Sequence, residues 1–535
     1  MAGDDRDQRQ HVEEDRQLEL GAIGRGAPVR PQATRRHAPR RNAPPRSGQT
    51  TAGAQEQREG EQNLDEQRGE NDGHRHGKKL LFRRAFLNPP APRRFRMRGS
   101  ARRARNRAMR RGALTGRRAG GFDGVPPTHP SGSSKKMSEN FRSAFVPHDL
   151  TAPVTGASTG PLAGLTAAVK DMYDVAGTRT GGGSPAWLAA HPPAERNAGL
   201  VEKLLGAGAT IVGKTVCDEF FYSVAGTNAH YGTPVNPRAP GRIPGGSSSG
   251  SASAAASGVC DVALGSDTGG SVRIPAAFCG LYGLRPTLGR MDLSGAMAMA
   301  PSFDVPGWMA AGPGVFAKVG DVLLSGSAAR TPVDKVIVLD DAFAQADPEV
   351  AAFLEETLAA MGDALPKMSH GAIAPEGFDV WREAFRVVQA FEVWKTFGAF
   401  VESKNPAFGP GVRERFETAA KITAEEADAA RVVKRNATEW IHGVAAPGTV
   451  LALPTAPCIA PRADEPADYM ESFRVRVMRL TCTAGISGLP QVTIPAGTIS
   501  GCPIGLSFIG WPGADEILLE LAVTLSRFVG ATSRS

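Results

Sequence analysis

The sequence is poor in the features that mark membrane-spanning, secreted and metal-binding proteins. It has six cysteines, none in a C-x-x-C pair, and the histidines of residues 137–535 have no metal-ligand spacing. No run of about 18 apolar residues is present, so no membrane-spanning helix is expected. Nothing indicates a secretory signal. We therefore expect a cytoplasmic protein with small, buried, reduced cysteines and no metal or cofactor.

The charge is divided unevenly along the 535 residues. Residues 1–136 hold 31 Lys and Arg against 15 Asp and Glu, whereas the remaining residues hold 31 against 39. The balance is thus +16 in the first part and −8 in the second. Binding to nucleic acid or to an anionic membrane is therefore expected only from the first part.

Residues 1–136 form an arginine-rich arm with hardly any apolar periodicity, and its densest charge runs from Pro92 to Arg118. Such a segment buries too little apolar surface to offset the entropy of ordering, so we expect it to be disordered. A targeting segment is one alternative, although its first seventy residues carry many acids, which transit peptides avoid. Another is that the native chain starts at Met137, where the composition becomes that of a globular domain.

From Leu162 onward the pattern alternates between strand and helix. No linker divides residues 150–530, which favours one large α/β domain over residues 137–535. The expected strands end at Lys170 or lie within 207–215, 334–339, 450–461 and 489–497, and residues 259–265 form a short apolar run. The expected helices lie within 199–206, 251–257, 348–361, 378–402, 424–441 and 515–528. The aromatic residues of 378–402 are expected in the core, with an aromatic pocket wall as the alternative.

Chemistry concentrates between Gly245 and Pro286, which reads GGSSSGSASAAASGVCDVALGSDTGGSVRIPAAFCGLYGLRP. Serines flanked by glycines combine hydroxyl nucleophiles with accessible backbone N–H groups, the equipment for attack on a carbonyl. Serine needs a base, and Lys170, 101 residues before Ser271, serves only if burial keeps it neutral. A lysine at a strand end with its ammonium in solvent is the simpler alternative.

Residues 246–250 also match G-x-S-x-G, the nucleophile elbow of α/β-hydrolases. That elbow follows a strand directly, whereas NPRAPGRIPGG precedes it here and holds three prolines. The downstream histidines are His370 and His442, and His442 is most simply a helix-end residue. The context therefore excludes the elbow.

The serine-rich stretch resembles the amidase signature family. The family pattern GGSSGG…GTDxGGSxRxPA is matched by GGSSSGS…GSDTGGSVRIPA. The resemblance continues through GLTAAVKDMYDVAGTRTGGGS, GKTVCDEFFYSVAGTNAHYGTPVNP, LALPTAP and SGLPQVTIPAG, and it covers roughly residues 145–530. The fragments are most similar to the plant indole-3-acetamide hydrolase type and its bacterial relatives. The resemblance implies an α/β fold with a central mixed sheet covered by helices.

The resemblance also implies roles for individual residues. Lys170 matches the catalytic lysine, Ser247 the serine after a cis peptide bond, and Ser271 the nucleophile. The implied oxyanion hole consists of the backbone N–H groups of Thr268, Gly269, Gly270 and Ser271. Phe221 and Tyr222 match residues that line the acyl pocket, which suggests an apolar or aromatic acyl group. Ordinary core aromatics are the alternative.

The implied activity is hydrolysis of a small carboxamide to carboxylate and ammonia through an acyl-enzyme. One departure concerns Ser249, which stands where the family has glycine. A positive φ at that position would strain the loop. Ser248 is expected to form a hydrogen bond within its loop, and Asp267 and Arg273 are expected to have structural roles.

Two other functions remain open. The first is the amidase-like component of the tRNA-dependent amidotransferase, which makes ammonia from glutamine for its partner subunits. Residues 137–535 are short and acidic for that role. The second is a non-catalytic amidase-like receptor, although Lys170, Ser247 and Ser271 are present and no helical repeats are found. The resemblance also suggests a homodimer.

Overall fold

The computed structural model describes residues 143–534 except 149, 151, 327–329 and 529–532. The predicted disordered arm, residues 1–136, lies outside the described residues. No helix in the described part of the chain is both long enough and apolar enough to cross a bilayer.

The strands of the described residues are as follows: β1 (Thr166–Lys170), β2 (Thr210–Thr215), β3 (Val262–Asp267), β4 (Tyr282–Arg285), β5 (Val305–Ala310), β6 (Lys335–Leu339), β7 (Met368–Gly371), β8 (Thr449–Pro454), β9 (Gln491–Ile499), β10 (Cys502–Ile509) and β11 (Ser533–Arg534).

The helices of the described residues are as follows: α4 (Pro185–Ala190), α5 (Gly199–Gly206), α6 (Ser249–Ala256), α7 (Arg273–Phe278), α8 (Pro313–Leu323), α9 (Asp340–Phe343), α10 (Pro348–Met361), α11 (Phe378–Lys404), α12 (Val412–Ala419), α13 (Ala424–Val444), α14 (Ala467–Ser487) and α15 (Asp515–Leu525). Short 3₁₀ turns cover Glu219–Phe221, Gly362–Ala364 and Ser526–Phe528.

These strands form one mixed sheet in the order β2-β1-β3-β5-β4-β9-β10-β8-β6-β7, with β11 beside β9. Strand β1 runs parallel to β2 and β3, and β6 runs parallel to β7 and β8. The pairs from β3 through β5, β4, β9 and β10 to β8 are antiparallel. The predicted central mixed sheet is therefore confirmed.

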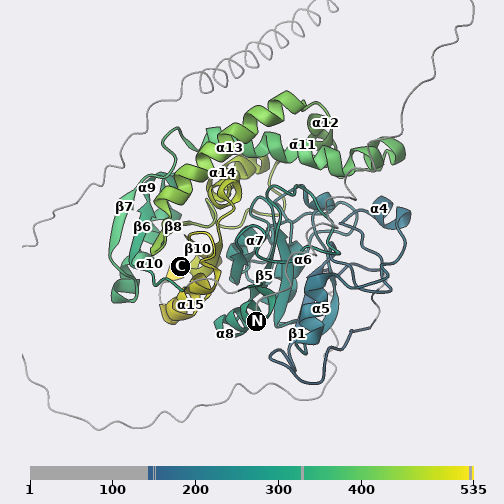
Figure 1. The fold of residues 1–535 in the computed structure, drawn as a ribbon, viewed down its shortest axis with the longest axis horizontal. Coiled ribbons are helices and arrows are strands. Elements are labelled where there is room, and N and C mark those ends of the chain that lie inside the picture. Colours follow the sequence, from purple (N-terminus) through teal and green to yellow (C-terminus); the bar gives the residue numbers. More distant parts are fainter. Residues whose placement is uncertain (1–142, 149, 151, 327–329, 529–532, 535) are drawn as a thin grey trace, which may run out of the picture. The chain divides into compact units, whose positions relative to one another are not determined.

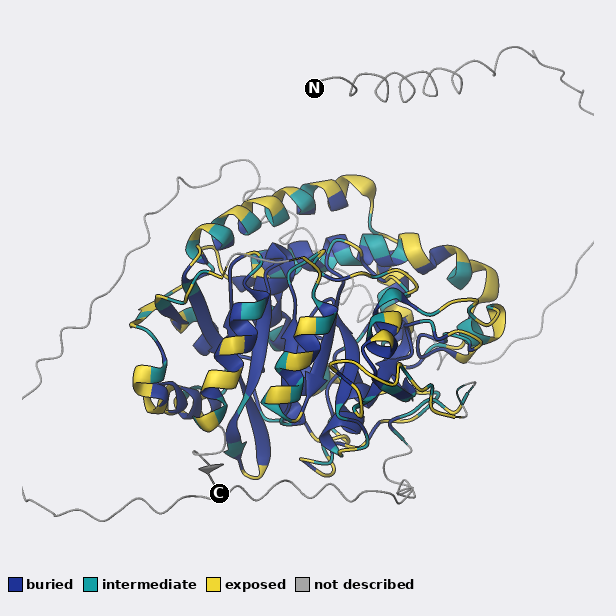
Figure 2. Cartoon of the chain, turned by 60° about the horizontal axis from the view of Figure 1, so that its bottom comes forward, coloured by how far each residue is buried: buried dark blue, intermediate teal, exposed yellow. Residues whose placement is uncertain are grey.

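Helices cover both faces of the sheet, and alternation along the strands determines which residues each helix meets. In β1, Ala168 packs in the cluster that holds the alanines of α6, whereas Ala167 and Val169 belong to the main core with α5 and α8. Successive side chains of a strand point to opposite faces, so α6 and α5 lie on opposite sides. Figure 2 shows the buried sheet between helices whose outer surfaces are exposed.

A layer of long helices adds a further wall. Helices α11, α13 and α14 pack on one another, and α12 packs on α11. They lie along the upper part of the molecule in Figure 1. The aromatic residues Trp381, Phe385 and Phe397 of α11 are buried in the core, as expected.

Most predicted elements are confirmed, with bounds within a few residues. The predicted strand 450–461 is an exception, because β8 ends at Pro454. The sequence analysis assigned no helix or strand to α4, α7, α8, α9, α12, α14, β3, β4, β5, β7, β10 or β11. Within α14, the segment FRVRVMR alternates apolar and charged residues like a strand. Packing of α14 against α11 and α13 favours the helix instead. All six cysteines are buried and unpaired, as predicted.

Candidate active site

Two parallel strands end at the site. Lys170 is the last residue of β1 and Asp267 the last residue of β3, and the two strands are neighbours with Val169 beside Leu264. Because the carboxyl ends of parallel strands meet at one edge of a sheet, the residues that follow them lie together. Residues 268–272 follow β3 and lead into α7, and the serines at 247–249 lead into α6.

The Lys170 ammonium group is fully buried between two hydroxyl groups. Its Nζ lies 2.8 Å from Ser247 Oγ and 2.8 Å from Ser266 Oγ. Burial lowers the pKa of Lys170 to about 8, against the opposing effect of Cys217 and Asp218. The alternative of a solvent-facing ammonium is therefore wrong. A lysine with this pKa is partly neutral near neutral pH and can accept a proton.

The segment around Ser247 is closely packed against Asp218. The peptide bond between Gly246 and Ser247 is cis, and Asp218 N–H donates to the Ser247 carbonyl oxygen at 3.2 Å. A Cβ atom at Gly246 would lie 2.5 Å from each carboxylate oxygen of Asp218, so only glycine fits there. Ser248 Oγ donates to the Ser266 carbonyl oxygen at 3.3 Å. The prediction that Ser248 bonds within its own loop is therefore wrong, because its hydroxyl group bonds the backbone of strand β3.

The strain expected at Ser249 is absent. Ser249 is the first residue of α6 and is not among the residues with positive φ. Its hydroxyl group is buried and has no hydrogen-bond partner among the described residues. Replacing the family's glycine therefore leaves the backbone helical but buries an unpartnered hydroxyl, which is costly.

Asp267 organises the loop that carries Ser271. Its carboxylate accepts from Gly270 N–H at 2.9 Å, from Val272 N–H at 3.1 Å and from Arg273 Nη2 at 2.7 Å. Burial alone would raise the pKa of Asp267, but Arg273 and Arg285 outweigh it and hold the pKa far below its ordinary value. The predicted structural roles of Asp267 and Arg273 agree with these contacts.

Of the four backbone N–H groups in the predicted oxyanion hole, one is already bonded to Asp267. Gly270, at φ +117°, gives its N–H to Asp267 and is not free to hold an oxyanion in this conformation. The N–H groups of Thr268, Gly269 and Ser271 donate to no acceptor in the described part of the chain. Three donors therefore remain beside the Ser271 hydroxyl.

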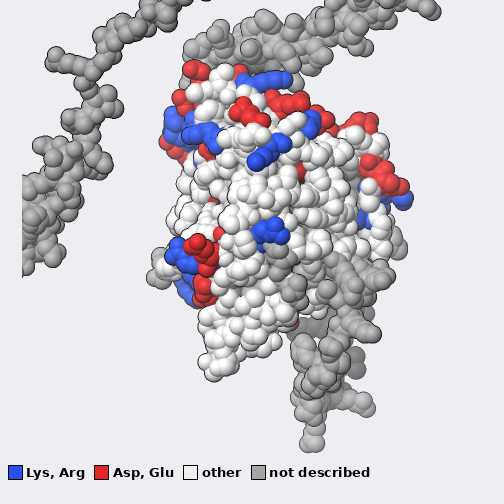
Figure 3. Space-filling view, turned by 90° about the vertical axis from the view of Figure 1, so that its right-hand side faces the viewer, with Lys and Arg blue, Asp and Glu red and all other residues white. Residues whose placement is uncertain are grey.

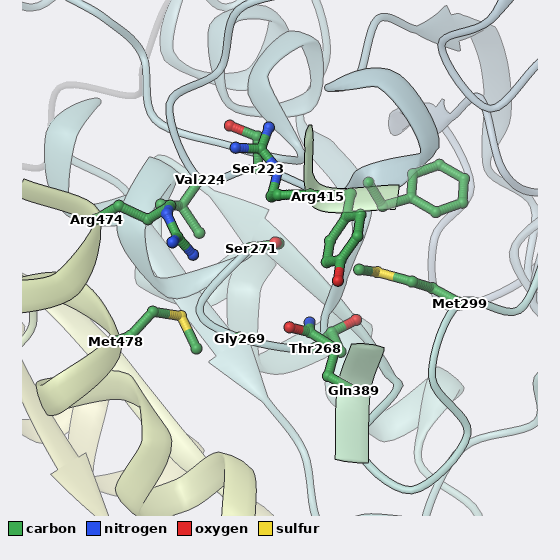
Figure 4. Close-up of a pocket in the computed structure, with 12 residues that line it drawn as sticks. Ser223, Val224, Thr268, Gly269, Ser271, Met299, Gln389, Arg415, Arg474 and Met478 are labelled. Atoms are coloured by element: carbon green, nitrogen blue, oxygen red, sulfur yellow. The ribbon is translucent and has the colours of Figure 1, made fainter. Parts of the chain in front are cut away.

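Ser271 lines a pocket that is open to solvent on one side. Figure 4 shows the Ser271 oxygen in the middle of the lining side chains. The lining comes from residues 221–224, from the loop after β3, from the segment before β5 and from helices α11, α12 and α14. The lining residues are Phe221, Tyr222, Ser223, Val224, Thr268, Gly269, Ser271, Met299, Gln389, Arg415, Arg474 and Met478.

Phe221 and Tyr222 both line this pocket, as the sequence predicted. The Lys170 Nζ lies 4.8 Å from the centre of the Phe221 ring, so this pocket residue also contacts the lysine. Part of the pocket lining is apolar, as an apolar acyl group would require, and includes Met299 and Met478. Gln389 and two arginines make the remainder polar.

Several residues of the site escaped the sequence analysis. Ser266 is next to the recognised Asp267, and its place at the end of β3 was the available signal. Asp218 is buried beside Gly246, and burial raises its pKa to about 6. Gln389, Arg415 and Arg474 come from three helices and carry no local motif. His370 and His442 contact Asp340 and the Ser487 carbonyl oxygen and do not line the pocket.

Comparison with known proteins agrees with this geometry. The family model Amidase matches residues 147–360 and 381–519. Amidase 1 of Arabidopsis thaliana is 35% identical over 418 residues, which cover 72% of this chain and 98% of that protein. A glutamyl-tRNA(Gln) amidotransferase subunit of Methanospirillum hungatei is 33% identical over 411 residues, covering 70% and 94%.

A solved structure described as a crystal structure of amidase superposes with a TM-score of 0.63 at 27% identity, covering 69% of this chain and 86% of that one. Family, relatives and fold agree with the serine and lysine pattern of the sequence. The chain therefore belongs to the amidase signature family, hydrolases that act on the carbon–nitrogen bonds of amides.

Proposed function

We propose that this protein hydrolyses primary amides of small carboxylic acids to carboxylate and ammonia, with Ser271 as nucleophile. The observation that carries the proposal is the buried contact of 2.8 Å between Lys170 Nζ and Ser247 Oγ, beside a pocket that Ser271 faces. Lys170, Ser247 and Ser271 are the proposed catalytic residues.

The reaction begins with proton transfer. Neutral Lys170 takes the proton of Ser247, and Ser247 takes the proton of Ser271 as Ser271 Oγ attacks the amide carbon. The proton then passes to the leaving amine, which departs as ammonia and leaves an acyl-enzyme. Water hydrolyses this ester by the same relay. The Ser248 N–H bond to the Ser271 carbonyl oxygen, at 3.3 Å, supports the close placement of the two serine segments.

The oxyanion of each tetrahedral intermediate is assigned to the N–H groups of Thr268, Gly269 and Ser271. These groups have no protein acceptor among the described residues, and loss of one such donor typically costs about 3–4 kcal/mol. Gly270, included in the sequence prediction, holds the loop through Asp267 instead.

The amidotransferase alternative rests on the similarity to the amidotransferase protein of Methanospirillum hungatei. It predicts ammonia release from glutamine only with partner subunits present. On the face shown in Figure 3, basic and acidic side chains are interspersed along the upper part, and most of the lower part is uncharged. No single-sign surface for a tRNA is visible on that face. The buried lysine and serines argue against the non-catalytic receptor.

Other features remain predictions. They are the boundary between an arm at 1–136 and an amidase domain at 137–535, the cytoplasmic location, and a homodimer. Nucleic-acid binding by the arm is a separate prediction that the amidase activity does not require.

The test is ammonia release from a panel of primary amides by the full chain and by Ser271→Ala. The matched control is Ser403→Ala, an exposed serine of α11. We expect release by the unchanged chain and the control but not by Ser271→Ala. Equal release by Ser271→Ala would refute the assignment.

A further inference from the structure

Two arginines reach the pocket that Ser271 faces, and only one of them has a partner. Arg474 of α14 forms a two-bond ion pair with Glu471 on the same helix, at 2.7 and 2.9 Å. Arg415 of α12 makes no ion pair with any described carboxylate, and its Nε is buried without a hydrogen-bond partner.

Arg415 is half-buried, and a charge taken out of water without a hydrogen-bonded partner is costly. The negative charges of Asp218 and Glu471 offset that cost only in part, because the pKa of Arg415 is still lowered. Its guanidinium carbon lies 5.8 Å from the centre of the Tyr222 ring, which is a weak contact. Burial and the charge of Arg474 lower the pKa of Arg415. An anion in the pocket would supply the missing partner, because a carboxylate accepts two parallel hydrogen bonds from one guanidinium.

The charged side chains that line the pocket are both basic. Its described lining holds two arginines and neither Asp nor Glu. The Gln389 side chain has no hydrogen-bond partner in the described part of the chain, so it is available to a ligand. In Figure 4, Arg415 and Arg474 lie with Ser223 and Val224 on one side of Ser271, and Thr268, Gly269 and Gln389 lie on the other.

We propose that the substrate is an ω-carboxy amide, whose amide group meets Ser271 while its distal carboxylate pairs with Arg415, assisted by Arg474. This inference rests on the proposed amidase function and specifies its substrate class. It replaces the purely apolar acyl group that Phe221 and Tyr222 suggested. An α-amino acid amide is disfavoured, because its ammonium group has no acidic partner in the lining and lies near two cations.

The experiment compares kcat/KM for carboxy amides of increasing length (malonamate, succinamate, glutaramate) with butyramide, valeramide and glutamine. The variants are Arg415→Met, which keeps length but removes charge, and Arg435→Met as the matched control. Arg435 is an exposed residue of α13 that makes no ion pair within the described ranges. Binding of glutarate and valerate to the Ser271→Ala chain, with and without Arg415→Met, is measured by calorimetry.

We expect kcat/KM to be higher for at least one carboxy amide than for the neutral amide of the same chain length. We also expect kcat/KM to be higher for glutaramate than for glutamine. Arg415→Met should lower kcat/KM for the carboxy amide by roughly 10- to 100-fold more than it lowers kcat/KM for butyramide, as expected for loss of a charged hydrogen bond. The control should change neither. Glutarate should bind more tightly than valerate, and Arg415→Met should remove that difference.

The results distinguish failure of the carboxylate inference from failure of the proposed amidase function. Hydrolysis of butyramide with no preference for any carboxy amide would overturn the inference and leave the amidase function intact. Hydrolysis of no amide would count against the proposed function, and the glutarate measurement would still decide the carboxylate site. Equal binding of glutarate and valerate, or an unchanged difference in Arg415→Met, would overturn the site.

Discussion

Single residues decide whether this site can work, and Lys170 is the most constrained of them. It is fully buried, and its Nζ contacts the hydroxyl groups of Ser247 and Ser266 rather than a carboxylate. Without a paired anion, burial favours the neutral form of the amine. The same burial that costs stability therefore prepares the proposed base.

The pH dependence of activity follows from this burial. Because the pKa of Lys170 is lowered to about 8, the neutral fraction rises with pH and passes one half near that value. We expect kcat/KM for butyramide to increase from pH 6 and to level off above pH 9, with a single ionisation. A flat profile over this range would argue against Lys170 as the base, and Lys170→Met should be inactive at every pH.

Ser249 allows a test of stability that is separate from catalysis. Its buried hydroxyl has no partner among the described residues, and a buried unsatisfied group costs about 1–3 kcal/mol. Ser249→Ala removes the hydroxyl and keeps a helix-forming residue at the start of α6. We expect the free energy of unfolding to rise by about 1 kcal/mol, measured by urea denaturation. A decrease would show that the hydroxyl is satisfied, for example by a water molecule.

At the scale of elements, the loop between β3 and α7 depends on one carboxylate. Asp267 holds Gly270, Val272 and Arg273 and also pairs with Arg285. The loop is therefore fixed from within the core, which leaves Ser271 and the backbone donors around it free to face the pocket.

Asp267→Asn should be severely destabilising, because it leaves two buried guanidinium groups with one fewer negative charge. Breaking a buried ion pair typically costs about 3–5 kcal/mol. The depressed pKa of Asp267 also means that its contribution is complete above the unfolded-state pKa of about 4 and is lost as the pH falls below it. Urea unfolding at pH 7 and pH 3 measures both effects.

The control for that experiment is Asp464→Asn, an exposed carboxylate paired with Arg462. Exposed ion pairs contribute little to stability, so the free energy of unfolding of Asp464→Asn should be nearly that of the unchanged chain. An equally small change in Asp267→Asn would contradict the role assigned to this carboxylate.

The helices and strands show which parts of the fold can be predicted from local sequence patterns. Strand β1 ending at Lys170 and helix α10 were predicted because apolar periodicity, glycine and proline mark them locally. Helix α14 was missed because FRVRVMR alternates like a strand, and only its packing partners favour a helix. The catalytic candidates lie in motifs, whereas Arg415 and Gln389 reach the site through packing that no local pattern encodes.

At the scale of the whole molecule, the pocket joins distant parts of the chain. Lys170 and Arg474 are separated by most of the described sequence, and the sheet and the layer of α11, α12 and α14 bring their segments to one site. The proposed catalytic residues come from the first part of the described sequence, whereas the proposed carboxylate partners Arg415 and Arg474 come from the second. The acidic balance of residues 137–535 leaves polyanion binding to the arm.

Removal of residues 1–136 tests whether the arm binds polyanions while the remaining chain carries the amidase activity. We expect the shortened chain, 137–535, to keep kcat/KM for butyramide within about twofold, because the proposed catalytic residues and the pocket lining lie between residues 170 and 478. Binding to single-stranded RNA, measured by fluorescence anisotropy, should be steeply salt-dependent for the full chain and absent without the arm. Lost amidase activity would show that the arm supports the fold or the pocket.

The most direct test of the whole account is to identify the acyl-enzyme. The full chain is mixed with p-nitrophenyl butyrate, quenched in acid within milliseconds to seconds, and digested for mass spectrometry. We predict a butyryl group on the peptide that contains Ser271, formed in a burst, absent in Ser271→Ala and greatly reduced in Lys170→Met. A butyryl group on another residue, or one that persists in Ser271→Ala, would contradict the account.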